Sequence, residues 1–292
     1  MAKRKDHSPT YFEVLQRASS FLTKKGQSAF AAEWLMRERL SWTKTDLIKN
    51  YQEEMPPAAK EQFEKDFQAF IAGKPMQQII GHDWFFDRKF KITKDTLIPR
   101  PETEEWLDRL LKKLPNRPLK VLDIGTGTGV LAITHKLERP QDQLTAIDIS
   151  GEALKVAQEN AKRLGADIHF IESDLFKKIG EESYDLILSN PPYIAYSEKD
   201  LMDASVLKHE PKGALFAEKN GLAIYEAIAQ EISPYLKSPY YIALEIGYAQ
   251  AEAVSRIFKE ALEDVCIEIW KDFNDLDRLV FIYQEPVDNN CG

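Results

Sequence analysis

The 292-residue sequence contains only two cysteines, Cys266 and Cys291, and they are not spaced as paired ligands. This scarcity argues against a disulfide framework and a structural zinc site, and it is typical of the reducing cytoplasm. No apolar run approaches the roughly 20 residues of a membrane span. The basic residues at positions 3–5 are not followed by an apolar segment, so they are not a secretory signal. We therefore expect a cytoplasmic protein without a membrane segment.

Histidine and clustered positive charge are also sparse. The five histidines are scattered, and none stands at ligand spacing from an aspartate, glutamate or cysteine, so we expect no metal site. The formal net charge is -8. Because binding to nucleic acid requires clustered lysine and arginine, this charge argues against direct contact with nucleic acid. The mildly basic residues 1–80 and the acidic remainder reflect either chance surface composition or two parts with different partners.

The first quarter of the chain shows only helical patterns. Ser8 and Pro9 predict the start of one helix, and residues 43–46 resemble the capping box of another. Aromatic and aliphatic residues recur at helical spacing through residue 71, and a glycine and a proline follow. We expect a small helical bundle at residues 1–76.

The character of the chain changes after the bundle. The apolar stretches 77–81 and 84–86, followed by 89–92, predict two short strands with a hairpin around Asp87 and Arg88. We therefore expect a β-hairpin linker at residues 77–97.

From residue 119 onward, apolar strands alternate with helical patterns. This alternation predicts an α/β domain at residues 98–292, with a mostly parallel sheet of seven strands and helices on both faces. The seven expected strands are 121–124, 144–148, 168–171, 184–188, 240–246, 267–270 and 279–283.

A glycine-rich turn follows the first strand of this domain. The turn reads Asp123-Ile124-Gly125-Thr126-Gly127-Thr128-Gly129, and Asp148 ends the next strand. Glycines let the backbone approach a ligand closely, and an acid about 20 residues further on is typical of a residue that binds ribose hydroxyls. We therefore expect these residues to bind a nucleoside cofactor.

Two cofactors compete for this turn. A dinucleotide site has the spacing G-x-G-x-x-G, whereas this turn has G-x-G-x-G. Asp123 places a carboxylate before the glycines, where it would repel a pyrophosphate and suit the ammonium group of a methionine moiety. The local pattern therefore favours S-adenosyl-L-methionine over NAD.

The tetrapeptide Asn190-Pro191-Pro192-Tyr193 follows the fourth strand. Loops at the carboxyl ends of parallel strands line the ligand crevice, and the two prolines stiffen this one. The Asn190 side-chain oxygen and the Pro191 carbonyl can accept the two N–H groups of a planar NH₂, while Tyr193 stacks on it. Orientation of that nitrogen toward a sulfonium methyl group predicts methyl transfer to an amide-type nitrogen.

These motifs, in this order, resemble the family of peptide-chain release factor glutamine methyltransferases. The resemblance also covers the helical N-terminal part, the hairpin and several further segments, which are 98–104 (Ile-Pro-Arg-Pro-Glu-Thr-Glu), 209–216 (His-Glu-Pro-Lys-Gly-Ala-Leu-Phe) and 220–222 (Asn-Gly-Leu). It implies a Rossmann-like class I methyltransferase fold and S-adenosyl-L-methionine as cofactor. It also implies a substrate, the glutamine side-chain amide in the Gly-Gly-Gln motif of class 1 release factors. We expect the protein to act as a monomer.

The resemblance further implies residues near the adenine of the cofactor. Asp174 is expected to accept from the adenine amino group, and Leu175 stands where the family often has an aromatic residue. Either Leu175 or Phe176 packs on the adenine. We expect Glu104 to be a first-turn acid favoured by the helix dipole. The roles of Arg100, Glu102 and Glu245 stay open between cofactor, substrate and structural contacts.

Other functions remain to be weighed against this one. The Asn-Pro-Pro-Tyr motif also suits the exocyclic amine of a flipped adenine, so a nucleic-acid methyltransferase is the main alternative. An NAD-dependent oxidoreductase is disfavoured by the glycine spacing and by the tetrapeptide. A non-catalytic binding module would tolerate replacement of Asn190.

Overall fold

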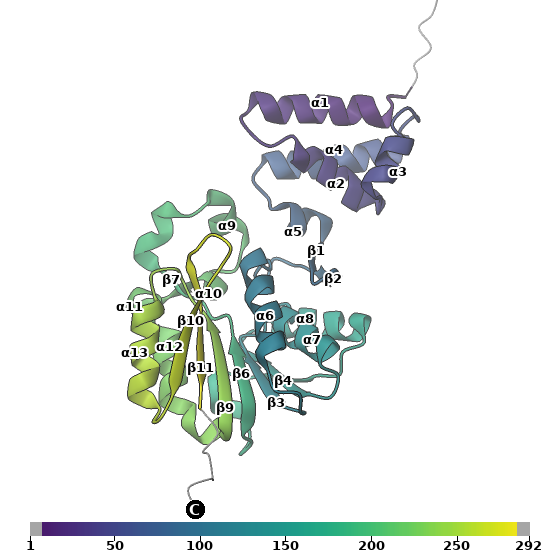
Figure 1. Cartoon of the computed structure of the whole chain (residues 1–292). Helices are drawn as coiled ribbons and strands as arrows, with labels where there is room; N and C mark the ends of the chain where they lie inside the picture. Colours follow the sequence, from purple (N-terminus) through teal and green to yellow (C-terminus); the bar gives the residue numbers. More distant parts are fainter. Residues whose placement is uncertain (1–7, 285–292) are drawn as a thin grey trace, which may run out of the picture. The chain divides into compact units, whose positions relative to one another are not determined.

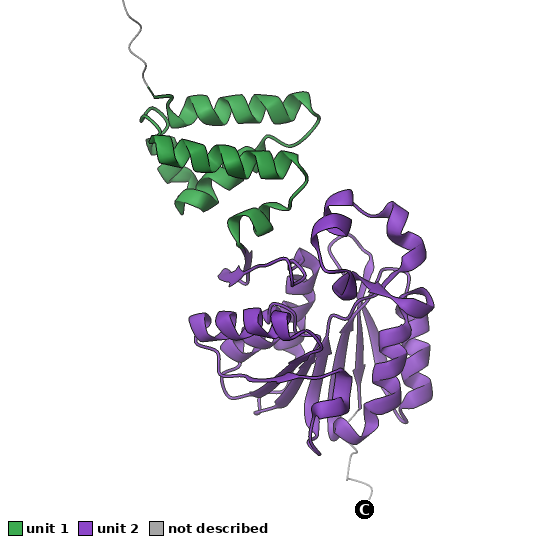
Figure 2. Ribbon diagram, turned by 180° about the vertical axis from the view of Figure 1, so that it is seen from behind, with its two compact units in different colours: residues 1–81 green, residues 82–292 purple. Residues whose placement is uncertain are grey.

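The computed structural model describes residues 8–284 and divides the chain into two compact units, Met1–Gly81 and His82–Gly292 (Figure 2). The finer division, with a separate linker at 77–97, stays a prediction. Cys266 lies in a strand of the second unit with a free thiol. The predictions about positions 3–5 and Cys291 lie outside the described residues.

The first unit is a bundle of helices with an apolar core. Leu22, Leu35 and Leu47 are completely buried in this core. Arg39 adds a two-pronged ion pair with the buried Asp66, at 2.6 and 2.9 Å. The helices are α1 (Tyr11–Lys24), α2 (Phe30–Leu40), α3 (Lys44–Lys49), α4 (Pro57–Ile71) and α5 (Met76–Ile80).

The first helix begins two residues later than the sequence pattern predicts. Thr10, not Ser8, is its N-cap: the Thr10 hydroxyl accepts from the Glu13 backbone N–H, and the Glu13 carboxylate accepts from the Thr10 N–H. This reciprocal pair satisfies two donors at the helix terminus, so it outweighs the Ser-Pro signal. The capping box predicted at Thr43 and Asp46 is confirmed.

Residues 77–80 are helical and Gly81 caps that helix, so the prediction of a strand at 77–81 was wrong. Pro75 precedes the single turn of α5, and Gly81 ends it in a left-handed conformation, φ 87°. A run of five residues is too short for its apolar pattern to separate helix from strand. The hairpin itself is confirmed: β1 (His82–Phe85) pairs antiparallel with β2 (Arg88–Lys91).

The second unit contains a seven-stranded sheet in the order β10-β11-β9-β6-β3-β4-β5, so the predicted α/β fold is confirmed. Only β11 runs against the others, because it pairs antiparallel with both β9 and β10. The strands are β3 (Lys120–Ile124), β4 (Gln143–Asp148), β5 (His169–Glu172), β6 (Tyr184–Ser189), β9 (Leu236–Glu245), β10 (Cys266–Lys271) and β11 (Asp277–Tyr283).

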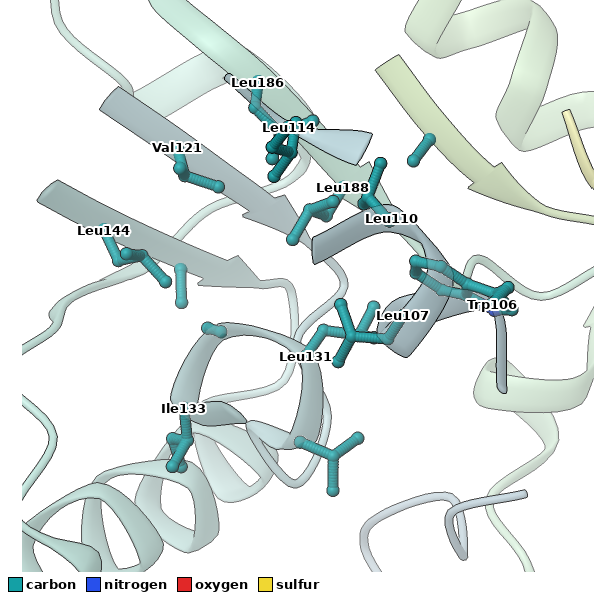
Figure 3. Close-up of a cluster of buried hydrophobic side chains, with 14 of the residues drawn as sticks. Trp106, Leu107, Leu110, Leu114, Val121, Leu131, Ile133, Leu144, Leu186 and Leu188 are labelled. Carbon is teal, nitrogen blue, oxygen red and sulfur yellow. The ribbon is translucent and has the colours of Figure 1, made fainter. Parts of the chain in front are cut away.

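Helices cover both faces of this sheet (Figure 1). On one face, α6, α7 and α8 pack over the sheet, and Leu107 and Leu110 of α6 lie beside Leu188 of β6 (Figure 3). On the other face, α12 and α13 bury Tyr225, Val254 and other apolar residues. These helices are α6 (Pro101–Lys113), α7 (Val130–Glu138), α8 (Gly151–Leu164), α12 (Ala223–Glu231) and α13 (Ala251–Ala261).

Short elements form the segment that connects β6 to α12. The two-residue strands β7 and β8 pair in parallel within it. The elements are β7 (Ile194–Ala195), η2 (Tyr196–Leu201), α9 (Ala204–His209), α10 (Lys212–Leu215), β8 (Phe216–Ala217) and α11 (Glu218–Gly221). Two more 3-10 turns, η1 (Leu175–Lys178) and η3 (Ser233–Tyr235), precede β6 and β9.

The strand order reverses direction between β3 and β6. The chain builds β3, β4 and β5 toward one edge, then returns to place β6 on the other side of β3. In open α/β sheets, ligands bind outside the carboxyl ends of the strands at such a switch point. The loops after Ile124 and Ser189 therefore lie side by side, since these two residues are register partners.

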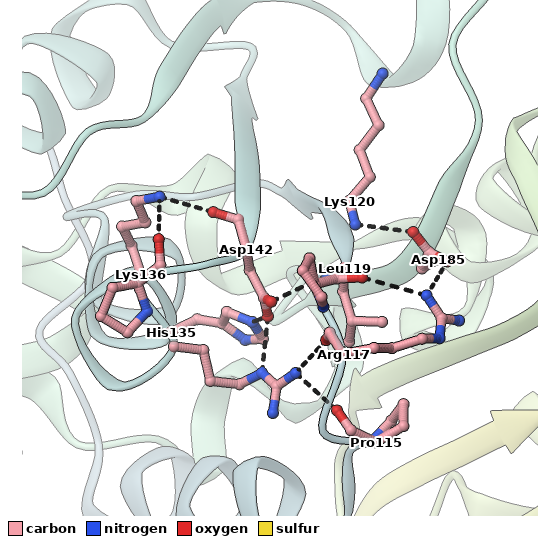
Figure 4. A network of polar contacts seen from close by, with 11 residues as sticks. Pro115, Arg117, Leu119, Lys120, His135, Lys136, Asp142 and Asp185 are labelled. Atoms are coloured by element: carbon pink, nitrogen blue, oxygen red, sulfur yellow. Dashed lines mark hydrogen bonds and ion pairs between the residues drawn. The ribbon is translucent and has the colours of Figure 1, made fainter.

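A buried polar network closes the opposite, amino edge of the sheet (Figure 4). Asp142 accepts from Arg139 at 2.8 Å and from the Leu119 backbone N–H at 3.0 Å, and it lies 2.7 Å from His135 Nε2. Burial lowers the pKa of His135, and its side chain is fully enclosed. This network joins the starts of β3 and β4 and lies away from the switch point.

His135 should make stability depend on pH. The ordinary pKa of His135 is 6.5, and its pKa in the folded protein is lower. As the pH falls below 6.5, the imidazole therefore binds a proton in the unfolded chain before it does so in the folded protein. The free energy of unfolding should therefore fall between pH 7 and pH 5. In His135→Gln, which is expected to lose about 1–3 kcal/mol at pH 7, this decline should be smaller. Urea unfolding at both pH values measures it, and equal declines in the two proteins would refute the assignment.

Candidate active site

Two adjoining cavities lie at the carboxyl edge of the sheet. The first has a volume of about 440 Å³, within the usual range of ligand pockets of roughly 300–1,000 Å³. The second has about 270 Å³. Both are lined by Leu97, Asn190, Pro191 and Ala214, so the loop after β6 forms part of their common wall.

The glycine turn forms the floor of the first cavity. Gly125, Gly127 and Gly129 have φ of 73°, 56° and 84°, a region that favours glycine. The backbone N–H groups of Gly125 and Thr126 donate to the Ile147 carbonyl at 2.9 Å, which ties the turn to β4. Gly129 is the N-cap of α7, and a Cβ on it would lie 2.7 Å from the Ile133 side chain.

Asp123 lies beneath this turn rather than in the cavity wall. It is completely buried, and one of its oxygens accepts from the Thr126 hydroxyl at 2.6 Å. Burial raises the pKa of Asp123 to about 7, against the lowering effect of that hydrogen bond. In this structure the carboxylate holds Thr126, and Thr126 lines the cavity.

Asp148 ends β4 at the cavity wall. Its two oxygens accept from the backbone N–H groups of Gly127 and Ser150, each at 2.9 Å. Burial raises the pKa of Asp148, and these two hydrogen bonds oppose the rise. Each carboxylate oxygen has a second lone pair, so both can still accept from a ligand hydroxyl. The next residue, Ile149, is 70% exposed and lines the same cavity.

The structure separates Leu175 from Phe176. Asp174 and Leu175 line the first cavity, whereas Phe176 is buried and stacks on Tyr235 with 4.5 Å between ring centroids. Leu175 has φ 47°, a rare conformation for a residue with a side chain. The Ser173 hydroxyl donates to the Leu175 carbonyl at 2.7 Å and thereby supports that conformation.

The loop after β6 separates the two cavities. The Ser189 hydroxyl donates to the Ile124 carbonyl at 2.8 Å, so β6 and β3 are joined where they end. Asn190 and Pro191 line both cavities, Pro192 lines the first, and Tyr193 lines the second. Asn190 Nδ2 donates to the Thr103 hydroxyl at 3.3 Å.

Contacts to the backbone of Tyr193 fix its position. Gln250 Nε2 donates to the Tyr193 carbonyl at 2.9 Å, and Gln250 Oε1 accepts from the Gly247 N–H at 2.9 Å. Gly221 passes so close that a Cβ on it would lie 2.0 Å from the Tyr193 carbonyl oxygen. Burial raises the pKa of Tyr193 well above its ordinary range, and the nearby Glu245 contributes, so the hydroxyl stays protonated at neutral pH.

Arg100 and the start of α6 lie beside the second cavity. Arg100 pairs with the buried Glu210 at 2.7 Å, and Glu210 also accepts from the Ile98 N–H at 3.2 Å. Segment 98–104 is therefore tied to segment 209–216, two stretches that are far apart in sequence. Glu102 and Glu104 lie in the first turn of α6, where the helix dipole favours acids.

The structure brings most of the predicted site residues together. The predicted residues that line one of the two cavities are Gly125 to Thr128, Asp148, Asp174, Leu175 and the tetrapeptide. Asp123 and Gly129 line neither cavity. Sequence reasoning did not single out other wall residues, although one of them, Thr103, belongs to segment 98–104. They include Asp95, Thr96, Leu97, Thr103, Ile149 and Ser173.

Within residues 8–284, no group of three or more His, Cys, Asp and Glu side chains is placed to hold a metal ion. Over the same residues, every helix is too short or too polar to cross a membrane.

The seven-stranded sheet is Rossmann-like, and comparison with protein families identifies the class as methyltransferase. The family model "Methyltransferase small domain" matches residues 107–225, and the model "PrmC N-terminal domain" matches residues 13–81. The structure is also similar to a methyltransferase from Pyrococcus furiosus, with a TM-score of 0.52 at 16% identity. That match covers 76% of this chain and 100% of the other, and it supports the fold alone.

Sequence comparison defines the family more narrowly. The chain is 44% identical over 279 residues to the release factor glutamine methyltransferase of Enterococcus faecalis, covering 96% of this chain and 99% of that protein. It is 39% identical over 272 residues to that of Staphylococcus aureus, covering 92% and 98%. The chain belongs to the release factor glutamine methyltransferase family, so the resemblance read from its motifs is confirmed.

Gly221→Ala should disturb the loop that carries Tyr193. The added Cβ would meet the Tyr193 carbonyl oxygen, and φ 83° strains any residue with a side chain. We expect a loss of about 1–3 kcal/mol in the free energy of unfolding, together with weaker catalysis. Gly180→Ala is the matched control, since that glycine is exposed with open space around it. Equal stability of the two variants, measured by urea unfolding, would refute the close approach.

Proposed function

We propose that this protein transfers the methyl group of S-adenosyl-L-methionine to the side-chain amide nitrogen of glutamine in the Gly-Gly-Gln motif of class 1 peptide-chain release factors. The observation that carries the proposal is the wall shared by the two cavities. There, Asn190 and Pro191 offer two oxygen acceptors between a cavity suited to a nucleoside and a smaller one suited to a side chain. The names of the relatives support the choice of substrate.

The first cavity fits the cofactor. Asp148 has free lone pairs for two ribose hydroxyls, and the glycine turn lets the methionine part approach the backbone. Ile149 and Leu175 present apolar surface for adenine, and Asp174 can accept from its amino group. A contact between Asp123 and the methionine ammonium stays a prediction, since Asp123 here lies beneath Thr126.

The chain's own residues then act on the amide. Its lone pair is conjugated with the carbonyl, so an amide nitrogen is a weak nucleophile. Acceptance of its two N–H groups by Asn190 Oδ1 and the Pro191 carbonyl holds the nitrogen in place and increases its electron density. Tyr193, protonated and half-buried, provides a flat surface for the planar group. When bound, the cofactor would supply an electrophilic methyl group on a sulfonium. Transfer would leave S-adenosylhomocysteine as the neutral thioether, and the methylated nitrogen would lose one proton to solvent.

Several properties belong to the same proposal. We propose that the protein acts in the cytoplasm as a monomer, without direct contact to nucleic acid. The net charge of -8 supports the last point, because phosphate binding requires clustered positive charge. The protein partner is the release factor itself.

The direct test is transfer of a labelled methyl group. The purified chain, labelled cofactor and a class 1 release factor should give one methyl group per release factor. Replacement of the glutamine in the Gly-Gly-Gln motif by alanine should abolish incorporation. Incorporation into that altered factor, or into DNA or RNA alone, would contradict the proposal.

Asp148→Ala and Asn190→Ala should fail in different ways. Asp148→Ala removes the ribose acceptor, so cofactor affinity should fall at least about tenfold. Asn190→Ala should keep cofactor affinity within about threefold but reduce kcat about 100-fold, by analogy with the loss of one group that orients the transition state. Calorimetric titration with the cofactor measures the affinity of each variant, and incorporation of the labelled methyl group measures its kcat. Similar cofactor affinities for both variants would contradict the assignment of Asp148.

A further inference from the structure

A chain of buried polar groups runs from the cavity wall into the core of the second unit. Asn190 Nδ2 donates to the Thr103 hydroxyl at 3.3 Å, and that hydroxyl donates to Glu245 Oε2 at 2.6 Å. Trp106 Nε1 donates to the same Oε2 at 2.8 Å. Thr103, Trp106 and Glu245 are each at most 3% exposed, so water does not compete for these contacts.

The hydrogen-bond directions in this chain follow from Trp106 and Thr103, which both donate to Glu245. An indole N–H can only donate, so Glu245 Oε2 must be an acceptor. The second lone pair of Oε2 takes the hydroxyl hydrogen of Thr103. The Thr103 oxygen then has only lone pairs to offer Asn190, so it selects the NH₂ side of that amide.

The consequence is a fixed orientation of the Asn190 amide. With its NH₂ committed to Thr103, the side-chain oxygen Oδ1 is the group left to face a ligand in the second cavity, which Asn190 lines. The reverse orientation would place Oδ1 against the Thr103 oxygen with no hydrogen between them. This direction requires that Oε2 carry no proton, which holds for the ionised carboxylate and for a carboxylic acid protonated on Oε1.

We propose that Thr103 and Glu245 are positioning residues that keep the oxygen of Asn190 directed at the substrate, so that the second cavity accepts an NH₂ group and rejects a carboxylate. This inference rests on the proposed function, since it concerns the same glutamine. It explains why Glu245 is retained beside the site although burial of a carboxylate is unfavourable: Glu245 accepts the hydroxyl hydrogen of Thr103, which is then not available to Asn190. Glutamine would thereby be distinguished from glutamate before any chemistry occurs.

Thr103→Val tests the relay, because valine keeps the shape and removes the hydroxyl. The Asn190 amide can then turn its NH₂ toward the cavity. We expect kcat to fall at least about tenfold while cofactor affinity stays within about twofold. We compare the Kd of the release factor with that of its variant in which the Gly-Gly-Gln glutamine is replaced by glutamate. In Thr103→Val, the preference for the glutamine form should fall at least about tenfold. Thr103→Ser restores the hydroxyl and should recover most of both properties.

Thr134→Val is the matched control. Thr134 in α7 is completely buried, and its hydroxyl has no hydrogen-bond partner among the described residues. The same chemical change there should leave kcat and the glutamine preference unchanged. Equal effects of Thr103→Val and Thr134→Val, or failure of Thr103→Ser to recover the glutamine preference, would overturn the relay.

A measurement on the unaltered protein covers the case in which Thr103→Val does not fold. With S-adenosylhomocysteine present, the unaltered protein should bind the glutamine form of the release factor at least about tenfold more tightly than the glutamate form. Equal binding would overturn the inference even if methyl transfer occurs. Tight binding of the glutamine form without methyl transfer would instead contradict the proposed function and leave the relay standing.

Discussion

The parallel pairing of β3 with β6 is the constraint on which the site depends. The register sets Ile124 beside Ser189, and the Ser189 hydroxyl fastens the two strand ends together. Because the strand order reverses here, helices do not cover the crevice above these ends. A turn that can hold a nucleoside and a loop that can hold an amide are thereby placed next to each other by backbone hydrogen bonds.

Around this point the protein retains buried charge that a hydrophobic core would avoid. Glu245 is buried, and its Oε2 accepts from Thr103 and Trp106, which are distant in sequence. Asp148 is partly buried, and its two oxygens accept from the backbone N–H groups of Gly127 and Ser150. A buried carboxylate without hydrogen-bond donors would lower the stability of the folded protein. The donors therefore stabilise these acids, and the acids in turn fix the positions of the donors. Arg100 and Glu210 do the same between two loops. Burial of charge at this edge contributes to the precision of the site.

The sequence predicted the parts of this site that local motifs encode. The glycines and Asp148 carry a spacing that backbone geometry requires, and the alternation of strands placed the tetrapeptide at a carboxyl end. Segment 98–104 was recognised as a motif, but the role of Thr103 within it could not be predicted, since its contacts lie 87 and 142 residues away. The same is true of Ile98, which meets Glu210 across 112 residues. The errors in the helical unit were local, where a capping box outweighed a Ser-Pro signal.

A structure of the protein with S-adenosylhomocysteine and a Gly-Gly-Gln peptide tests the central claim most directly. The account predicts that the glutamine amide nitrogen lies about 3 Å from both Asn190 Oδ1 and the Pro191 carbonyl oxygen, with the sulfur of the cofactor product on its other side. The ribose hydroxyls should meet Asp148. An amide bound outside the second cavity, or a carbonyl oxygen in place of the NH₂ at Asn190, would contradict the account.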